Sequence, residues 1–220
     1  MSSATITTSA RLMNSTPQTE EQAMVRKVAV SSFLGNFIEW FDYASYSYFA
    51  TTIALVFFPT DNHTVAMLQT FGVFALSFIL RPIGALFWGS YGDKKGRKAA
   101  LAHSIMFMSG ASFLIGCLPS YSVIGVGAPI LLLLLRMVQG FSASGEYAGA
   151  ATFLGEYAPT SKRGIYCSLI PASTAIGLLA GSTLATLMTA NMNSSAMVGW
   201  GWRVPFLLAG PLGLIVLYIR

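Results

Sequence analysis

Six long apolar blocks, separated by short polar segments, make up most of this chain. They cover about residues 28–58, 65–88, 99–118, 128–154, 165–190 and 204–219. A helix needs roughly 20 mostly apolar residues to cross a bilayer, and isolated strands cannot satisfy their backbone polar groups in lipid. The pattern therefore predicts an all-α, polytopic membrane protein, with a bundle of six transmembrane helices over residues 28–220 that lies in the lipid bilayer.

The first 27 residues differ from the rest. They are rich in Ser and Thr and contain no apolar block. Such a composition cannot form a packed core, and it lacks the hydrophobic region of a cleavable signal peptide. We expect residues 1–27 to be a disordered cytoplasmic tail.

Charged residues make up only 10% of the chain and lie mostly in clusters between the apolar blocks. The net charge of +5 therefore reflects basic clusters that set the orientation of the helices in the membrane, and we expect no nucleic-acid partner. Basic residues fall on one predicted side of the membrane: Arg11, Arg26, Lys27, Lys94, Lys95, Arg97, Lys98, Lys162, Arg163 and Arg220. Arg203 alone falls on the other side. This asymmetry predicts a multi-pass protein of the cell membrane with both termini in the cytoplasm.

Five charged residues lie inside apolar blocks: Glu39, Asp42, Arg81, Arg136 and Glu146. Each costs at least about 2.5–3.5 kcal/mol in hydrocarbon unless it is paired or faces water. They are therefore candidates for a transport site. The alternative is that they only hold helices together.

Depth along the predicted helices suggests which charges meet, at about 1.5 Å of rise per residue. Glu39, Asp42 and Arg136 come near the membrane midplane, whereas Arg81 and Glu146 come nearer the cytoplasm. We therefore expect a central layer of the first three residues and a second charged layer of Arg81 with Glu146. Helical spacing also gives two polar stripes, one with Asn36, Glu39, Tyr43, Tyr46 and Ala50, and one with Arg136, Gln139, Ala143 and Glu146. Such stripes face a bundle interior or a water-filled cavity.

The segment GSYGDKKGRKAAL, residues 89–101, resembles the signature G-x-x-x-D-R/K-x-G-R-K/R of the major facilitator superfamily. The matching residues are Gly89, Asp93, Lys94, Gly96, Arg97 and Lys98. The glycines permit a tight cytoplasmic turn, and Asp93 is suited to a helix N-terminus, where its charge is favoured. Two further segments, RMVQG from Arg136 and GEYAPTSKRG at 155–164, are similar to other elements of that superfamily. The resemblance implies a cytoplasmic gating network of Asp93, Arg97, Glu156 and Arg163.

Four other segments, GNFIEWFDY, RPIGALFWG, GEYAGAA and WGWRVPF, resemble the metabolite:proton symporter branch of the superfamily. That branch includes carriers of proline and betaine, α-ketoglutarate, citrate and shikimate. The resemblance implies a bacterial inner-membrane carrier that works by alternating access, with this chain as its amino-terminal half. The partner would be the missing carboxyl-terminal half or a second half-carrier.

The resemblance and the polar stripes together suggest proton-coupled symport of a small organic acid or zwitterion. Glu39 or Asp42 would be the proton site, in a central cavity that Tyr43 and Gln139 help to form. Arg136 would hold the anionic group of the substrate, because a guanidinium binds a carboxylate through two hydrogen bonds.

Two other readings are possible. The chain could be a non-transporting half-carrier with a structural or sensory role. It could also be an intramembrane serine hydrolase, since GFSASGEY contains Ser142 and Ser144, although a triad also needs a nearby histidine such as His103 or His63. We expect the protein not to be an enzyme, whether it is a transporter or has a structural or sensory role. The sequence indicates no metal site, no cofactor and no ATP-binding loop.

Overall fold

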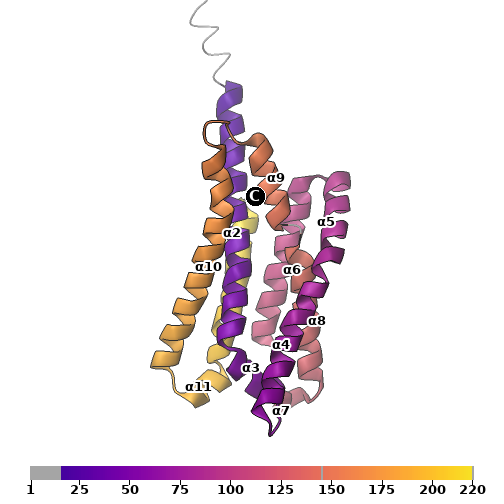
Figure 1. Ribbon diagram of the computed structural model, residues 1–220, viewed down its shortest axis with the longest axis vertical. Coiled ribbons are helices and arrows are strands. Elements are labelled where there is room, and N and C mark those ends of the chain that lie inside the picture. The colour runs from indigo at the N-terminus through magenta and orange to yellow at the C-terminus, as the bar shows by residue number, and fades with distance from the viewer. Residues whose placement is uncertain (1–15, 145, 220) are drawn as a thin grey trace, which may run out of the picture.

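Helices run side by side along a common axis in the computed structural model, which describes residues 16–144 and 146–219 (Figure 1). They are α2 (Thr16–Tyr48), α3 (Ala50–Phe57), α4 (His63–Ile79), α5 (Arg81–Lys95), α6 (Arg97–Cys117), α7 (Tyr121–Ile124), α8 (Gly127–Ala143), α9 (Glu146–Tyr157), α10 (Arg163–Asn191), α11 (Ser194–Gly199), the 3-10 helix η1 (Gly201–Arg203) and α12 (Val204–Ile219). The all-helical fold class is confirmed for the described residues.

Each predicted apolar block corresponds to a helical segment, but three of the blocks are interrupted. Phe49 separates α2 from α3, Leu80 separates α4 from α5, and α8 ends at Ala143 before α9 begins at Glu146. The interruption at Leu80 has a local cause, because Pro82 lacks the amide hydrogen that would bind the carbonyl of Phe78 in a continuous helix. The first helix also begins earlier than predicted. Residues 16–27 are helical rather than a disordered tail, and residues 1–15 lie outside the described residues.

Four helices within the described residues are long and apolar enough to cross a membrane. They cover His63–Lys95, Ala99–Cys117, Arg163–Asn191 and Gly201–Ile219. Gly127–Ala143 is apolar as well but shorter. A multi-pass membrane protein is therefore supported, while the number of six spans stays a prediction.

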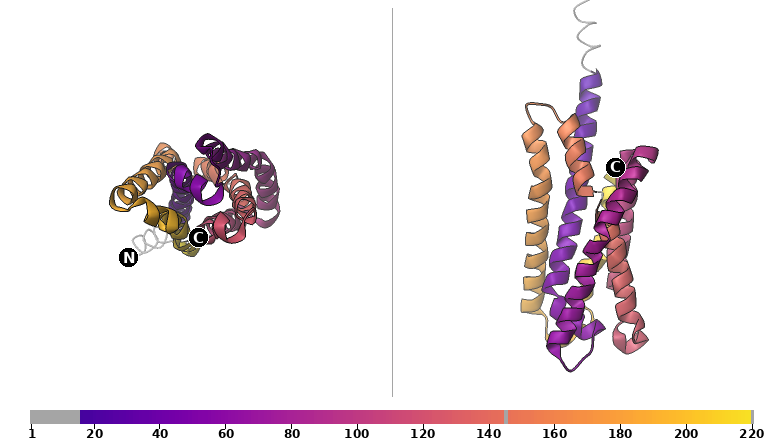
Figure 2. Two further views of the ribbon diagram at one scale, coloured as in Figure 1. Left: turned by 90° about the horizontal axis from the view of Figure 1, so that it is seen from below. Right: turned by 45° about the vertical axis from the view of Figure 1, so that its right-hand side comes forward.

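The long helix α2 lies between α10 on one side and α4–α5 on the other (Figures 1 and 2). Behind it, α12 packs against α6 and α2, and α8 packs against α6 and α4. The short helices α3, α7 and α11 lie at one end of the bundle, whereas α2 begins and α12 ends at the opposite end (Figure 1). Lys94 and Lys95 end α5 at that second end, and Lys162 precedes α10 there.

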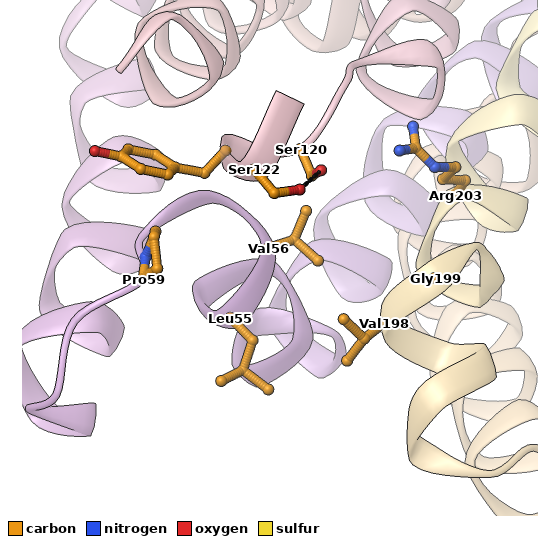
Figure 3. Close-up of a pocket in the computed structure, with 9 residues that line it drawn as sticks. Leu55, Val56, Pro59, Ser120, Ser122, Val198, Gly199 and Arg203 are labelled. Carbon is orange, nitrogen blue, oxygen red and sulfur yellow. Dashed lines mark hydrogen bonds between the residues drawn. The ribbon is translucent and has the colours of Figure 1, made fainter. Parts of the chain in front are cut away.

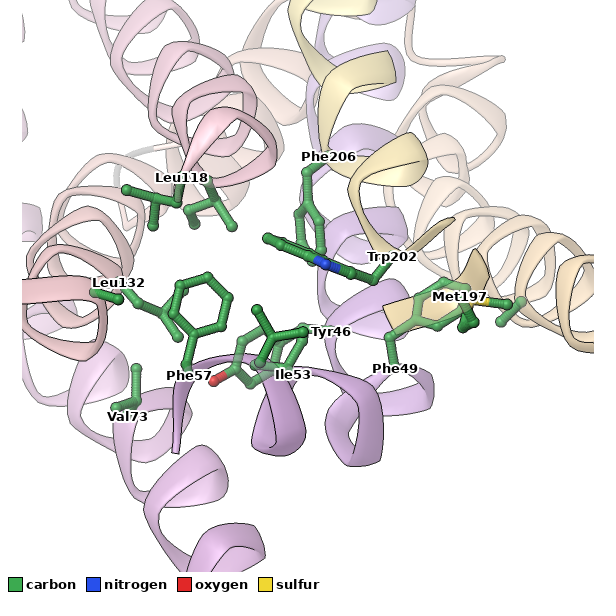
Figure 4. Packing of buried hydrophobic residues seen from close by; sticks show 14 residues of the cluster. Tyr46, Phe49, Ile53, Phe57, Val73, Leu118, Leu132, Met197, Trp202 and Phe206 are labelled. Atoms are coloured by element: carbon green, nitrogen blue, oxygen red, sulfur yellow. The ribbon is translucent and has the colours of Figure 1, made fainter. Parts of the chain in front are cut away.

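A core of aromatic and branched side chains closes the end of the bundle that carries α3, α7 and α11 (Figure 4). Trp202 is fully buried there, and its ring meets that of Phe57 edge to face at 5.3 Å between centroids. Aromatic pairs in this geometry add about 0.5–1.5 kcal/mol beyond the apolar area that they bury. This core fixes the helix ends around the polar residues deeper in the bundle.

Close contact between α4 and α8 depends on one glycine. A Cβ atom at Gly140 would overlap the backbone carbonyl of Ser77, so only glycine fits there. This close approach places α8 so that its polar residues face α2.

Candidate functional site

Asp42 and Arg136 form an ion pair between α2 and α8 in the interior of the bundle. Arg136 Nη1 lies 2.5 Å from Asp42 Oδ2. Gln139 Nε2 donates to the other carboxylate oxygen at 3.2 Å and also to the hydroxyl of Ser112 on α6. The side chains of Arg136 and Asp42 are only 1% and 5% exposed. The pair therefore joins three helices in an environment with little water.

Aromatic rings hold the Arg136 guanidinium on its other sides. Its central carbon lies 3.9 Å from the ring centre of Tyr46 and 5.5 Å from that of Phe206. The Tyr46 hydroxyl donates to the carbonyl of Thr70 on α4 at 2.9 Å, which fixes the ring. A cation over aromatic faces is favourable, and more so when it is desolvated.

A second ion pair lies between α2 and the start of α5. Arg81 Nη2 donates to Glu39 Oε1 and to the hydroxyl of Tyr43. The Arg81 guanidinium also lies 4.7 Å from the ring centre of Phe78 and 5.2 Å from that of Tyr43. The Glu39 side chain is buried, but that of Arg81 is 28% exposed. This pair thus lies at the edge of the bundle, whereas the first lies inside it.

The observed pairing corrects the predicted layers. Asp42 does meet Arg136, as expected, but Glu39 does not join them and binds Arg81 instead. Arg81 was expected to meet Glu146. The side chain of Glu146 lies outside the described residues, so only the Arg81 side of that prediction is tested. An arginine side chain is long enough to reach past one helical turn, which is why depth alone assigned Glu39 to the wrong layer.

The predicted exposure of these carboxylates to a water-filled cavity is also not what the structure shows. Glu39 and Asp42 are 3% and 4% exposed, and Arg136 is fully buried. Two groups nevertheless retain unused hydrogen-bonding atoms, since Nε and Nη2 of Arg136 and Oε1 of Gln139 form no hydrogen bond with described residues. The bundle interior therefore contains buried polar atoms that lack a hydrogen-bond partner among the described residues.

The polar stripe predicted on α2 meets different helices along its length. Asn36 donates from Nδ2 to the carbonyl of Ile170 and to the hydroxyls of Ser173 and Thr174 on α10, at 2.8–3.1 Å. Tyr43, two turns further on, meets α5 instead. The stripe thus holds α2 to both of its neighbours.

The predicted gating motif lies where α5 passes into α6. Gly96 separates the two helices with a φ of +92°, a left-handed conformation that favours glycine, so the predicted glycine turn is confirmed at this position. Asp93 lies in the last turn of α5 rather than at a helix N-terminus. Arg163 begins α10, and Glu156 lies exposed near the end of α9. The side chains of Arg97 and Lys98 lie outside the described residues, so the network of Asp93, Arg97, Glu156 and Arg163 stays a prediction.

The serine and histidine residues of the hydrolase alternative are not arranged as a catalytic pair. The Ser144 hydroxyl donates to the carbonyl of Phe141 at 2.8 Å. The Nδ1 atom of His103 lies 2.7 Å from the carbonyl oxygen of Ala99. Among the described residues, neither Ser142 nor Ser144 forms a hydrogen bond with a histidine, as nucleophilic catalysis would require.

A pocket of about 510 Å³ lies apart from both ion pairs, at the end of the bundle with α3, α7 and α11 (Figure 3). Arg203 points into its edge, opposite Ser120 and Ser122. The same arginine donates to the carbonyls of Gly116 and Leu118, at the carboxyl end of α6. Cations are favoured at that end of a helix, so Arg203 has a structural role there.

Sequence reasoning missed three contributors to the two ion pairs. Ser112 binds Gln139, and the rings of Phe78 and Phe206 contact Arg81 and Arg136. Ser112 and Phe206 lie in apolar blocks remote in sequence from the charges they serve, so no local pattern indicates them. Phe78 could have been noticed, because it lies three residues before Arg81 and so about one turn away.

The helical bundle has the fold of solved structures of the major facilitator superfamily, a class of membrane transporters. The xylose transporter from Escherichia coli, in a partially occluded inward-open form, has the same fold, with a TM-score of 0.77 at 18% identity over 88% of this chain and 48% of that one. A crystal structure of a D-xylose–proton symporter gives 0.76 at 17% identity, over 89% of this chain and 47% of the other. Within this class, the chain belongs to the family described as "Sugar (and other) transporter", whose profile matches residues 27–220.

Curated relatives are similar over most of this chain. The glycine betaine/proline/ectoine/pipecolic acid transporter of Dickeya dadantii (strain 3937) is 44% identical over 200 residues, which are 91% of this chain and 40% of the relative. The proline/betaine transporter of Escherichia coli (strain K12) is 42% identical over the same shares. The chain thus spans less than half the length of these relatives. They are transporters and not enzymes.

Proposed function

We propose that this chain forms the amino-terminal, six-helix half of a secondary transporter that carries a small zwitterion or organic acid together with a proton. The observation that carries the proposal is the buried Asp42–Arg136 pair, which joins α2 to α8 inside a transporter fold. The similarity to proline and betaine transporters supports a zwitterionic osmolyte as the substrate. We place the protein in the bacterial inner membrane with both termini in the cytoplasm.

Protonation of Asp42 offers a coupling step. A charged pair in a dry interior is stable only while both partners remain, because loss of one leaves an uncompensated charge. Proton uptake by Asp42 would leave Arg136 without its counter-ion. The helices would then be driven to rearrange until Arg136 finds another anion, which is the way a proton could promote a change of access. Gln139 would follow, since it binds the same carboxylate.

The second half of the transporter would cover the exposed apolar faces of α4–α5 and α10, on either side of α2. Leu76, Ile79 and Ile83 on one side and Ile176 and Leu179 on the other are all more than two-fifths exposed. Major-facilitator transporters place their substrate site between two halves. The gating motif between α5 and α6 would then close the cytoplasmic side, with Asp93, Arg97, Glu156 and Arg163 as its charged members.

Uptake into proteoliposomes tests the proposal. With the native polypeptide reconstituted, an inward proton gradient should drive accumulation of labelled glycine betaine or proline, and a protonophore should abolish it. Asp42→Asn should retain exchange of substrate across the membrane but lose accumulation driven by the gradient. Glu39→Gln provides the comparison, because the paired Arg81 can be partly hydrated and coupling should survive at least in part. Full coupling in both variants would refute a proton site at either carboxylate.

The mass of the intact polypeptide in its native membrane tests the half-transporter reading separately. A species near twice 23.5 kDa would agree with two joined halves. A species of 23.5 kDa would require that two copies, or this chain and another, associate before transport. Uptake that is insensitive to the protonophore would favour a non-coupled role.

A further inference from the structure

We propose that Arg81, Glu39, Phe78 and Tyr43 form the amino-terminal half's contact for a zwitterion with a quaternary ammonium and a carboxylate, and that the substrate binds by replacing the internal Glu39–Arg81 pair. The inference rests on the proposed transport function and assigns the substrate contact to Arg81 instead of Arg136. Its basis is the difference between the two ion pairs.

Accessibility separates the two arginines. The Arg81 side chain is 28% exposed, whereas that of Arg136 is 1% exposed. Phe78, which lies against Arg81, is itself 39% exposed. The Arg81 pair therefore lies at a surface of the six-helix bundle, whereas the Arg136 pair is enclosed by it. The first contact with a substrate thus belongs to Arg81.

Aromatic rings at this pair already hold a cation. The Arg81 guanidinium lies 4.7 Å from the ring centre of Phe78 and 5.2 Å from that of Tyr43, within the range of a cation–π interaction. The Glu39 carboxylate adds a negative charge beside them. A quaternary ammonium has no hydrogen-bond donor and is recognised by aromatic faces and an anion of this kind. The place that the guanidinium now occupies therefore suits the cationic end of such a zwitterion.

Arg81 itself suits the carboxylate end. Its guanidinium binds Glu39 and Tyr43 through one nitrogen, Nη2, and its buried Nε has no hydrogen-bond partner among the described residues. Once the cationic end of the ligand has displaced the guanidinium from the rings, a carboxylate could take two parallel hydrogen bonds from Nε and Nη2, which is a stronger arrangement than a single bond. The unused donor would then be satisfied.

Charge balance explains why the ligand should carry both charges. The Glu39–Arg81 pair is neutral. When a zwitterion binds, its cation can pair with Glu39 and its carboxylate can pair with Arg81, so that no net charge is left unpaired. A simple cation would leave Arg81 without an anion, and a simple anion would leave the buried Glu39 without a cation. The site should therefore discriminate against ligands with only one of the two charges.

Three probes of similar shape test this selectivity. They are glycine betaine, its carbon isostere 3,3-dimethylbutanoate, which lacks the cation, and choline, which lacks the carboxylate. Binding is measured by isothermal titration calorimetry with the purified native polypeptide, so that the result does not depend on proton coupling. We expect glycine betaine to bind at least about tenfold more tightly than either of the other two.

Substitution of Phe78 tests the location of the site at a residue that is itself partly exposed. Phe78→Leu should raise the Kd for glycine betaine about fivefold to thirtyfold, whereas Phe78→Tyr should leave it nearly unchanged because the aromatic face remains. Phe71→Leu is the matched control, since Phe71 is similarly exposed at 42% on the same helix but lies two turns away. Arg81→Lys should also weaken binding, because an ammonium cannot make the two parallel bonds.

The outcomes separate this inference from the proposed function. Phe78-dependent binding of glycine betaine supports the inference even if no proton-driven uptake is found. Binding that is unchanged in both Phe78→Leu and Arg81→Lys overturns it, even if uptake is proton-coupled. Equal binding of the three probes, or no binding of glycine betaine, overturns it as well.

Discussion

Loss of the Asp42 carboxylate should destabilise the protein more than loss of Glu39. In Asp42→Ala, Arg136 and Gln139 both lose an acceptor, and the Arg136 side chain, only 1% exposed, keeps an uncompensated charge. Such a change costs about 3–5 kcal/mol. In Glu39→Ala, Arg81 keeps its hydrogen bond to Tyr43 and is 28% exposed, so the cost should be about 1.5–3 kcal/mol, the value of a hydrogen bond to a charged group.

Thermal unfolding in detergent, followed by tryptophan fluorescence, measures this difference. At about 2–4 °C per kcal/mol for a chain of this size, Asp42→Ala should lower the Tm by about 6–20 °C. Arg136→Met in the same background should recover most of the loss, because it removes the unpaired charge. Asp61→Ala, in the exposed loop before α4, is the control and should change the Tm little. Equal losses for Asp42→Ala and Glu39→Ala, or no recovery in the double variant, would refute the reasoning.

Two further substitutions test the packing around the site. Trp202→Ala should cost about 3–5 kcal/mol of unfolding free energy because the ring is fully buried. Trp200→Ala should cost little, because 57% of that residue is exposed. Similar losses of Tm in the two variants would contradict this. Gly140→Val should separate α8 from α4 by collision with the Ser77 carbonyl and reduce both stability and uptake, while Gly110→Val, with nothing within 4 Å of its Cβ position, should be tolerated. A stable, active Gly140→Val protein would show that the helices can move apart at no cost.

The apolar pattern was sufficient to predict the helices but not their interruptions. Each block corresponds to a helical segment because only helices satisfy the backbone in lipid. The interruption at Leu80 had a signal in the sequence, since Pro82 has no amide hydrogen with which to continue the helix. The helical state of residues 16–27 had no such signal. Val25 and Ala29 pack into a cluster with α9 and α10, a tertiary contact that no local pattern shows.

The partners of the charged residues required the structure. Glu39 and Asp42 are three residues apart, so they differ in depth by only about 4.5 Å. That difference is smaller than the reach of an arginine side chain, which can extend along a helix for more than a turn. Arg81 could therefore meet either carboxylate, or Glu146, on depth alone. The position of α5 beside α2 decides for Glu39, and the position of α8 decides for Asp42.

The two pairs differ in burial although they lie about one turn apart on α2, and this difference divides their proposed roles. A pair at the surface of the six-helix bundle is able to exchange its partners for a substrate, as we propose for Glu39 and Arg81. A pair closed inside the bundle can respond only to a proton or to a rearrangement of the helices, as we propose for Asp42 and Arg136. Glu39 and Asp42 belong to the same helix. A substrate that displaces α2 at Glu39 would therefore also change the position of Asp42 relative to Arg136. This gives a short physical route for coupling substrate to proton within one half of the transporter.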